Sequence, residues 1–195
     1  MLIIVVVLAM GWFYGGIRTP GKTATPEDTA HILSPEEIID QLRQKAAQGD
    51  MLTQFDLGRM YDEGRGVPQD YQEAAKWYRQ AAAQGYAVAQ YNLGVMYGKG
   101  QGVPQDYQEA MKWYRQAAAQ GRAAAQYNLG VMFVNGEGVS KNYVEGYAWI
   151  IIALENGMED ANQAKAQIEE RLDASQIEAA ERRAEEIRSG LKNKR

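Results

Sequence analysis

Cysteine is absent from this chain of 195 residues, and only one histidine is present, His31. The lack of cysteine excludes disulfides, thiolate catalysis and cysteine-ligated metal sites, and it leaves the cellular compartment open. A Ser-His-Asp, Cys-His or multi-histidine site would have to rest on His31, which lies in a stretch rich in threonine and proline and is more typical of a solvated residue. We therefore predict no enzyme activity, no catalytic residue, no metal site and no cofactor.

An excess of positive charge is also missing. The formal net charge is −4, and no basic stripe is present that could displace the counterions of a phosphate backbone. We therefore predict no nucleic-acid partner. Hydrophobic residues make up 46% of the chain, which is enough for a core, and the 20 glycines indicate that backbones approach one another closely.

The clearest positive feature is a period of 36 residues through the middle of the chain. Glycine-rich tracts, tryptophans and single glycines recur at this interval: Gly64, Gly100 and Gly136; Trp77, Trp113 and Trp149; Gly49, Gly85, Gly121 and Gly157. A fixed period of this length indicates a repeat array, in which each unit is too small to bury its apolar face alone and stacks on its neighbours.

One unit, residues 86–121, shows what a repeat contains. Apolar and small residues recur at steps of three and four over residues 89–97, which predicts a helix with one apolar face. Glycines and Pro104 end this helix, and a second apolar stripe then runs to the end of the unit. Each unit is therefore predicted to be an antiparallel helix hairpin, and the chain to be all-α.

Each second helix is predicted to begin at a polar cap. The side chain of Asp106 would accept a hydrogen bond from a backbone N–H at the start of the helix, and the side chain of Glu109 would reach back to complete a capping box. The same spacing occurs in the other units, at Asp70 with Glu73 and at Asn142 with Glu145. Because the pattern recurs in every unit, we interpret these carboxylates as caps and not as acid–base pairs. One tryptophan per unit at the same helical position likewise favours a role in core packing over a role in an aromatic cage for a ligand.

These motifs carry a family resemblance. Ala-x-Ala-Gln-Tyr-Asn-Leu-Gly-Val-Met-Tyr, then Gly-x-Gly-Val-Pro-Gln-Asp-Tyr, resembles the Sel-one-like repeat (SLR) family, a relative of the tetratricopeptide repeat, over residues 50–157. The resemblance implies a right-handed α/α solenoid used mostly for protein–protein interaction, often in extracytoplasmic or membrane-linked bacterial proteins. A cysteine-rich branch of the family is linked to β-lactam binding or hydrolysis, and the lack of cysteine argues against that activity here.

The first 17 residues form an uncharged apolar segment. This length is at the lower edge of the roughly 17–25 residues that span a bilayer. The segment lacks a basic start and a clear cleavage site, which favours an uncleaved anchor over a cleaved signal. We predict a membrane-anchored or exported protein with its repeats in the periplasm. Arg18 and Lys22 follow the segment, and by the positive-inside rule they favour the alternative, the cytoplasmic face.

The chain is therefore predicted to have five parts. A hydrophobic anchor or signal helix (1–17) and a flexible linker (18–33) precede an N-terminal capping helix (34–49), three hairpin repeats (50–157) and C-terminal capping helices (158–195). Ser34 and Pro35 mark the start of the first capping helix, and Asp173 with Gln176 marks the start of the last one.

A partner surface is predicted by similarity to tetratricopeptide repeats, in which the first helix of each unit lines the concave side. Nine residues would face this groove, three from each unit: Phe55, Arg59 and Glu63; Tyr91, Val95 and Lys99; Tyr127, Val131 and Asn135. Such an aromatic and apolar row suits an extended or helical peptide. The alternative is that the rings seal neighbouring hairpins together.

The resulting prediction is a non-catalytic adaptor or scaffold that binds another protein or peptide, with a membrane contact through residues 1–17. One alternative is a cell-envelope enzyme acting on peptidoglycan or β-lactams, which rests on family analogy alone. Another is an oligomerisation module, favoured if the last helix buries its apolar stripe against a second copy.

Overall fold

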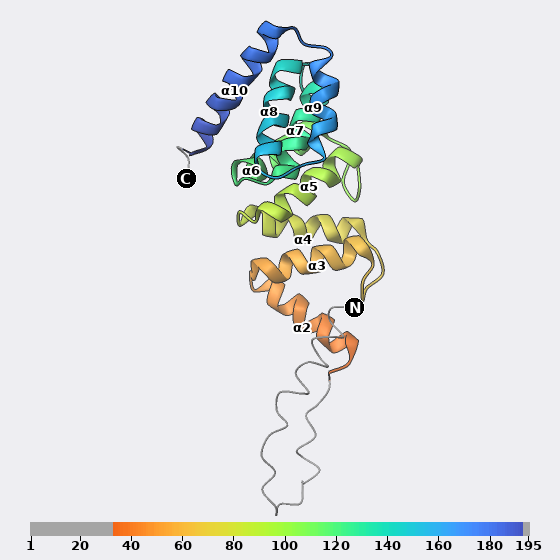
Figure 1. The fold of residues 1–195 in the computed structure, drawn as a ribbon. Helices are drawn as coiled ribbons and strands as arrows, with labels where there is room; N and C mark the ends of the chain where they lie inside the picture. The colour runs from red at the N-terminus through yellow and green to blue at the C-terminus, as the bar shows by residue number, and fades with distance from the viewer. Residues whose placement is uncertain (1–32, 193–195) are drawn as a thin grey trace, which may run out of the picture. The chain divides into compact units, whose positions relative to one another are not determined.

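The chain folds as a stack of helices. The structure, a computed structural model, describes residues 33–192, and all regular secondary structure in that range is α-helical (Figure 1). In chain order the helices are α2 (Pro35–Ala47), α3 (Met51–Glu63), α4 (Tyr71–Ala83), α5 (Ala87–Lys99), α6 (Tyr107–Ala119), α7 (Ala123–Asn135), α8 (Tyr143–Glu155), α9 (Ala161–Glu169) and α10 (Ala174–Lys192). The predicted anchor helix (1–17) and the predicted linker up to residue 32 lie outside the described residues.

The repeats are three hairpins, α3–α4, α5–α6 and α7–α8. Every helix in them has 13 residues, and each hairpin packs against the next through α4 with α5 and α6 with α7. Helix α2 packs on α3 at one end, while α9 and α10 pack on α8 at the other. The predicted right-handed α/α solenoid of antiparallel helix hairpins is therefore confirmed.

Close approach within each hairpin depends on a glycine in the first helix. A Cβ atom added at Gly94 would lie 2.7 Å from the ring of Tyr114, well inside van der Waals contact. The other two hairpins repeat this arrangement, with Gly58 against Tyr78 at 2.5 Å and Gly130 against Ile150 at 2.8 Å. The glycines therefore let the second helix of each unit pack a large buried side chain directly onto the first.

The glycine-rich tracts are turns that also join neighbouring units. Gly100 ends α5 in the left-handed region, with φ of 68°, and its N–H donates to the carbonyl of Met96. Two residues on, Gly102 also has φ of 68°, and a Cβ there would lie 2.0 Å from the carbonyl oxygen of Tyr71 in the preceding unit. Only glycine can fit that position, so the turn fixes the stacking as well as the chain reversal.

The caps of the second helices differ in one respect from the prediction. Asp106 accepts from the backbone N–H groups of Gln108 and Glu109, at 2.9 and 3.0 Å, as expected. The backbone N–H of Asp106, however, donates to the carbonyl of Tyr97 at 2.9 Å. Glu109 instead pairs with Lys112, at 2.9 Å. The predicted reciprocal capping box is therefore wrong at this helix, because the preceding helix already satisfies the group that Glu109 would have bonded.

A reciprocal capping box is present at the start of α10. The side chain of Asp173 accepts from the N–H of Gln176 at 2.9 Å, and the side chain of Gln176 accepts from the N–H of Asp173 at 3.0 Å. The last helix therefore begins where the sequence indicated, and it runs back across α8 (Figure 1).

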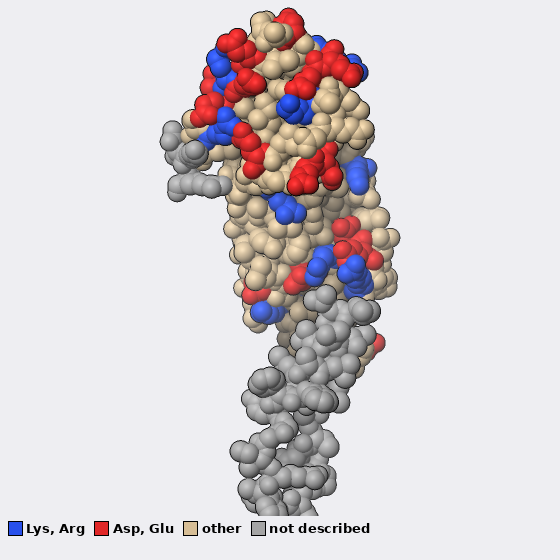
Figure 2. Space-filling model, in the orientation of Figure 1, with Lys and Arg blue, Asp and Glu red and all other residues tan. Residues whose placement is uncertain are grey.

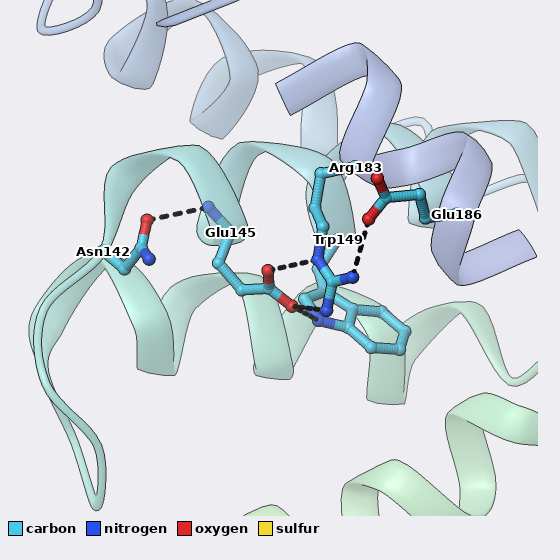
Figure 3. A network of polar contacts seen from close by, with 5 residues as sticks. All are labelled: Asn142, Glu145, Trp149, Arg183 and Glu186. Atoms are coloured by element: carbon cyan, nitrogen blue, oxygen red, sulfur yellow. Dashed lines mark hydrogen bonds and ion pairs between the residues drawn. The ribbon is translucent and has the colours of Figure 1, made fainter. Parts of the chain in front are cut away.

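Helix α10 is held on the third repeat by a polar network (Figure 3). Glu145 of α8 accepts from the indole Nε1 of Trp149 at 3.2 Å and from Nε of Arg183 at 2.7 Å. The equivalent glutamates of the first two repeats pair with a lysine three residues on, whereas the third repeat has Ala148 at that position. The carboxylate is therefore free to bind the capping helix, and this pairing raises the pKa of the Arg183 guanidinium.

The apolar stripe of α10 lies beneath these ion pairs. Ala180 and Ala184 have no exposed surface, and Ile187 is 9% exposed against the same core that holds Trp149. In the first two repeats the indole nitrogens of Trp77 and Trp113 are buried without a hydrogen-bond partner among the described residues. The tryptophans therefore pack into the core, and of the three indole nitrogens that of Trp149 has a hydrogen-bond partner, Glu145.

Candidate interaction surface

Buried glutamines hold the first helix of each repeat against the unit before it. Gln90 of α5 is 4% exposed, and its Nε2 donates to the carbonyl of Ala82 at 3.1 Å. Its Oε1 accepts from Nε2 of Gln120 in the next loop, at 2.9 Å. The same ladder of amides recurs at Gln54 with Gln84 and at Gln126 with Asn156. We did not predict this ladder from the sequence, although Gln54, Gln90 and Gln126 recur at the period of 36 residues.

Two hollows lie side by side on the stack. The first, here called the central hollow, has a volume of about 380 Å³ and is bounded by α5, α6, α7 and the turn after α7. The second, the distal hollow, has a volume of about 450 Å³ and is bounded by α7, α8, α9 and the loops that flank α8 and α9. Val131 of α7 lines both of them, so the two hollows adjoin at this residue.

Most of the predicted partner residues line these hollows. Tyr91, Val95, Lys99 and Val131 border the central hollow. Tyr127 and Asn135, again with Val131, border the distal hollow. The structure therefore brings together the predicted residues of the second and third repeats, one helical turn apart along α5 and α7.

The three predicted residues of the first repeat line neither hollow. The ring of Phe55 packs against Tyr78 and Tyr86, with ring centroids 5.7 and 5.0 Å apart. Arg59 pairs with Asp56 at 3.0 Å, and Glu63 pairs with Arg65 at 2.8 Å. The three predicted residues of α3 therefore lie outside both hollows.

The aromatic residues of the predicted row differ in how far they are used in packing between hairpins. Phe55 is half-buried between neighbouring hairpins, as the sealing interpretation expects. The ring of Tyr91 lies 5.9 Å from that of Tyr114 and under the guanidinium of Arg122, at 5.5 Å, yet it still borders the central hollow. Tyr91 therefore takes part in the packing and also borders the central hollow.

The chemistry of the hollows suits contact more than bond breaking. Their lining residues include no serine, histidine, cysteine or aspartate, and Glu137 is their one carboxylate. Burial raises the pKa of Tyr114, which also has a side-chain hydrogen bond with Asn128, so its hydroxyl stays neutral. Over residues 33–192, no three histidine, aspartate or glutamate side chains gather as metal ligands. The residues that line the two hollows therefore offer no serine–histidine or cysteine–histidine pair.

None of the helices between residues 33 and 192 combines the length and the apolar character that crossing a bilayer requires. The predicted anchor over residues 1–17 lies outside this range.

Comparison with known proteins begins with the repeats. A family model described as "Sel1 repeat" matches residues 52–86, 87–121 and 123–158, which is more than half of the chain. No curated protein matches the chain. The matched segments coincide with the hairpins α3–α4, α5–α6 and α7–α8.

Several solved structures are similar to this one. A Sel1 repeat protein from Oxalobacter formigenes is 40% identical with a TM-score of 0.61, and the match covers 67% of this chain and 54% of that one. A protective antigen of uropathogenic Escherichia coli strains, displaying an SLR fold, is 30% identical with a TM-score of 0.59, over 78% of this chain and 41% of that one. Cysteine rich protein B of Helicobacter pylori shares the fold at 20% identity and a TM-score of 0.51, over 67% of this chain and 93% of that one. The chain thus spans about half or less of the first two proteins.

Proposed function

This chain belongs to the Sel1 repeat family, and from that premise we propose that it is a non-catalytic scaffold that binds a segment of another protein. The observation that carries the proposal is the pair of adjoining hollows, central and distal, which meet at Val131. A surface of this kind, concave and lined by aromatic, aliphatic and amide side chains on rigid helices, suits a peptide that is extended or helical.

The scaffold below the surface supports this role. The glycine contacts and the buried amide ladder fix the spacing of α5 and α7, so the surface is formed before a partner arrives. A preformed site avoids the entropy of ordering side chains on binding. Half-buried Val95 and Val131 would supply apolar contact, and the amide of Asn128 lies in the same hollow to bond a peptide backbone.

The location of the protein is the second part of the proposal. Residues 1–17 anchor the protein in a membrane or direct its export, and the repeats work in the periplasm, with the cytoplasmic face of the membrane as the alternative. Support comes from the uncharged apolar segment and from similarity to a protein described as a protective antigen. Fractionation of cells producing the full chain, with protease added to intact spheroplasts, distinguishes the two faces.

Photo-crosslinking in living cells tests the binding surface. A photoreactive residue is placed at Val95 or Val131 in the hollows, and at Val88 as the matched control. Val88 is also a half-buried valine of α5, but it borders neither hollow. The proposal expects one shared protein adduct from positions 95 and 131 that is missing from position 88. Equal adducts from all three positions, or no adduct from the hollows, would count against it.

An oligomerisation role has less support. The apolar stripe of α10 is buried against α8 of the same chain, at Ala180, Ala184 and Ile187, so it does not need a second copy to cover it. The envelope-enzyme alternative likewise gains no support from the residues of the hollows.

A further inference from the structure

The distal hollow contains two cations that have no anion of their own. Lys141, in the loop before α8, and Arg171, just after α9, both border the hollow and both are exposed. Neither forms an ion pair with a carboxylate anywhere in residues 33–192. By contrast, the arginines of the neighbouring helix α10, at 182, 183 and 188, are each paired with glutamate.

A tyrosine ring brings the two cations to one place. The Nζ of Lys141 lies 5.9 Å from the ring centroid of Tyr143, and the guanidinium carbon of Arg171 lies 5.8 Å from it. A guanidinium nitrogen of Arg171 also donates to the Tyr143 hydroxyl at 3.4 Å. Cation–π contact of this kind holds a side chain in position without neutralising its charge. The pair therefore stays available to an anion from outside.

The floor beside the cations is apolar. Val131 and Val134 of α7 and Ile150 of α8 line the same hollow, and Gln167 of α9 adds an amide at its edge. A ligand that fits this site has a carboxylate next to a bulky apolar side chain, with a backbone that can bond to an amide. We infer that the distal hollow binds an acidic peptide segment of a partner protein, in which aspartate or glutamate lies beside an aliphatic or aromatic residue.

This inference rests on the proposed function and gives its partner a chemical character. Charge favours a peptide over a membrane surface. The chain has a net charge of −4, and carboxylates crowd the C-terminal end of the stack around α9 and α10 (Figure 2). An anionic bilayer laid over that end would be repelled, whereas a narrow segment can reach the two cations without covering the carboxylates of α9 and α10. The guanidinium of Arg171 can donate to a carboxylate in the bidentate geometry that arginine favours.

The test starts from selection of a random short-peptide display library on the purified full chain. The probe for binding is the most enriched peptide, carrying a fluorescent label, in an anisotropy titration. Acidic residues next to apolar ones are expected to be enriched. Changing both cations, Lys141→Gln with Arg171→Gln, is expected to raise the Kd about tenfold or more, and the matched change Arg115→Gln to leave it within about twofold. Arg115 is likewise exposed and has no ion pair among the described residues, but it borders neither hollow.

A double-mutant cycle gives the decisive result. Replacing the acidic residue of the peptide by glutamine weakens binding to the wild type but has little further effect on the Lys141→Gln, Arg171→Gln protein. Matching thermal melts by circular dichroism exclude unfolding as the cause. Additive losses, or an equal loss with Arg115→Gln, would overturn the acidic-peptide inference. Selected peptides that contain no acidic residue and lose binding with Val131→Asp would overturn the acidic-peptide inference but support the proposed function. A selection that yields no binding peptide would contradict both.

Discussion

Replacing Gly94 with alanine tests whether the hairpins need a backbone without a side chain. A Cβ atom at this position would lie 2.7 Å from two ring carbons of Tyr114 and 3.3 Å from the carbonyl oxygen of Ala110. Carbon atoms are at their optimum about 3.5–4.0 Å apart, so the ring would have to move by about 1 Å. Tyr114 is 6% exposed and belongs to a buried core cluster, so a shift of its ring would disturb its neighbours.

Two opposing effects set the size of the loss. Overpacking of a tight core costs about 1–3 kcal/mol, while alanine gains about 1 kcal/mol over glycine inside a helix. We therefore expect Gly94→Ala to destabilise the fold by up to about 2 kcal/mol. Gly190 of α10 is the matched control, because it also lies in a helix but has no atom within 4 Å of an added Cβ. Gly190→Ala should stabilise by up to about 1 kcal/mol.

The assay is urea unfolding followed by circular dichroism at the helical signal and by tryptophan fluorescence. The two substitutions should shift the unfolding midpoint in opposite directions, with slopes that stay close to that of the wild type. Midpoints that shift equally and in the same direction would refute the argument, because helix propensity alone would then account for both. Loss of coincidence between the two probes would show that the repeats unfold separately.

Three further changes test other contacts. Gln90→Met, which keeps the length of the side chain but removes its buried hydrogen bonds, should cost about 1–2 kcal/mol in urea unfolding. Arg183→Ala should cost about 1 kcal/mol and raise hydrogen exchange in α10, because it removes the bond to Glu145. Burial raises the pKa of half-buried Asp62, so the folded state holds that proton more tightly and loses stability as pH rises through the raised pKa. Asp62→Asn should therefore be more stable than the wild type at neutral pH, with the difference vanishing in acid.

Two of these changes have a matched control, and the third has an outcome that would contradict it. Gln108→Met alters an exposed glutamine at the start of α6 and should leave the unfolding midpoint unchanged. Arg182→Ala removes an ion pair within α10 itself and should not loosen that helix from α8. An Asp62→Asn protein that follows the pH profile of the wild type would show that this carboxyl does not contribute to the profile.

Local chemistry made the helices predictable. The glycines after α5 and α7 end those helices in the left-handed region, at Gly100 and Gly136, as the spacing indicated. Asp106 caps α6 through its own neighbours, so its role could be predicted from a few residues of sequence. The partner of Glu109 could not, because the carbonyl that satisfies the cap belongs to Tyr97 on the preceding helix and depends on how the two helices pack.

Contacts between units were harder to predict than the units themselves. The hydrogen bond between Glu145 and Arg183 joins residues 38 positions apart. Glu145 is available for it because the third repeat has Ala148 where the other two repeats have a lysine. The hollows depend in the same way on the spacing of α5, α7 and α9. The period gave Tyr91 and Tyr127 equivalent places, but their different neighbours put them in different hollows, and Phe55 in none.

The most direct test of the central claim is the affinity of the partner identified by crosslinking, measured by calorimetry against the full chain. Val95→Asp with Val131→Asp places charge on the shared surface of the two hollows, while Val88→Asp places it elsewhere on α5. The scaffold account predicts that the first protein loses binding, while the control keeps the affinity of the wild type, with both folded as judged by circular dichroism. Equal binding by both folded variants would contradict it.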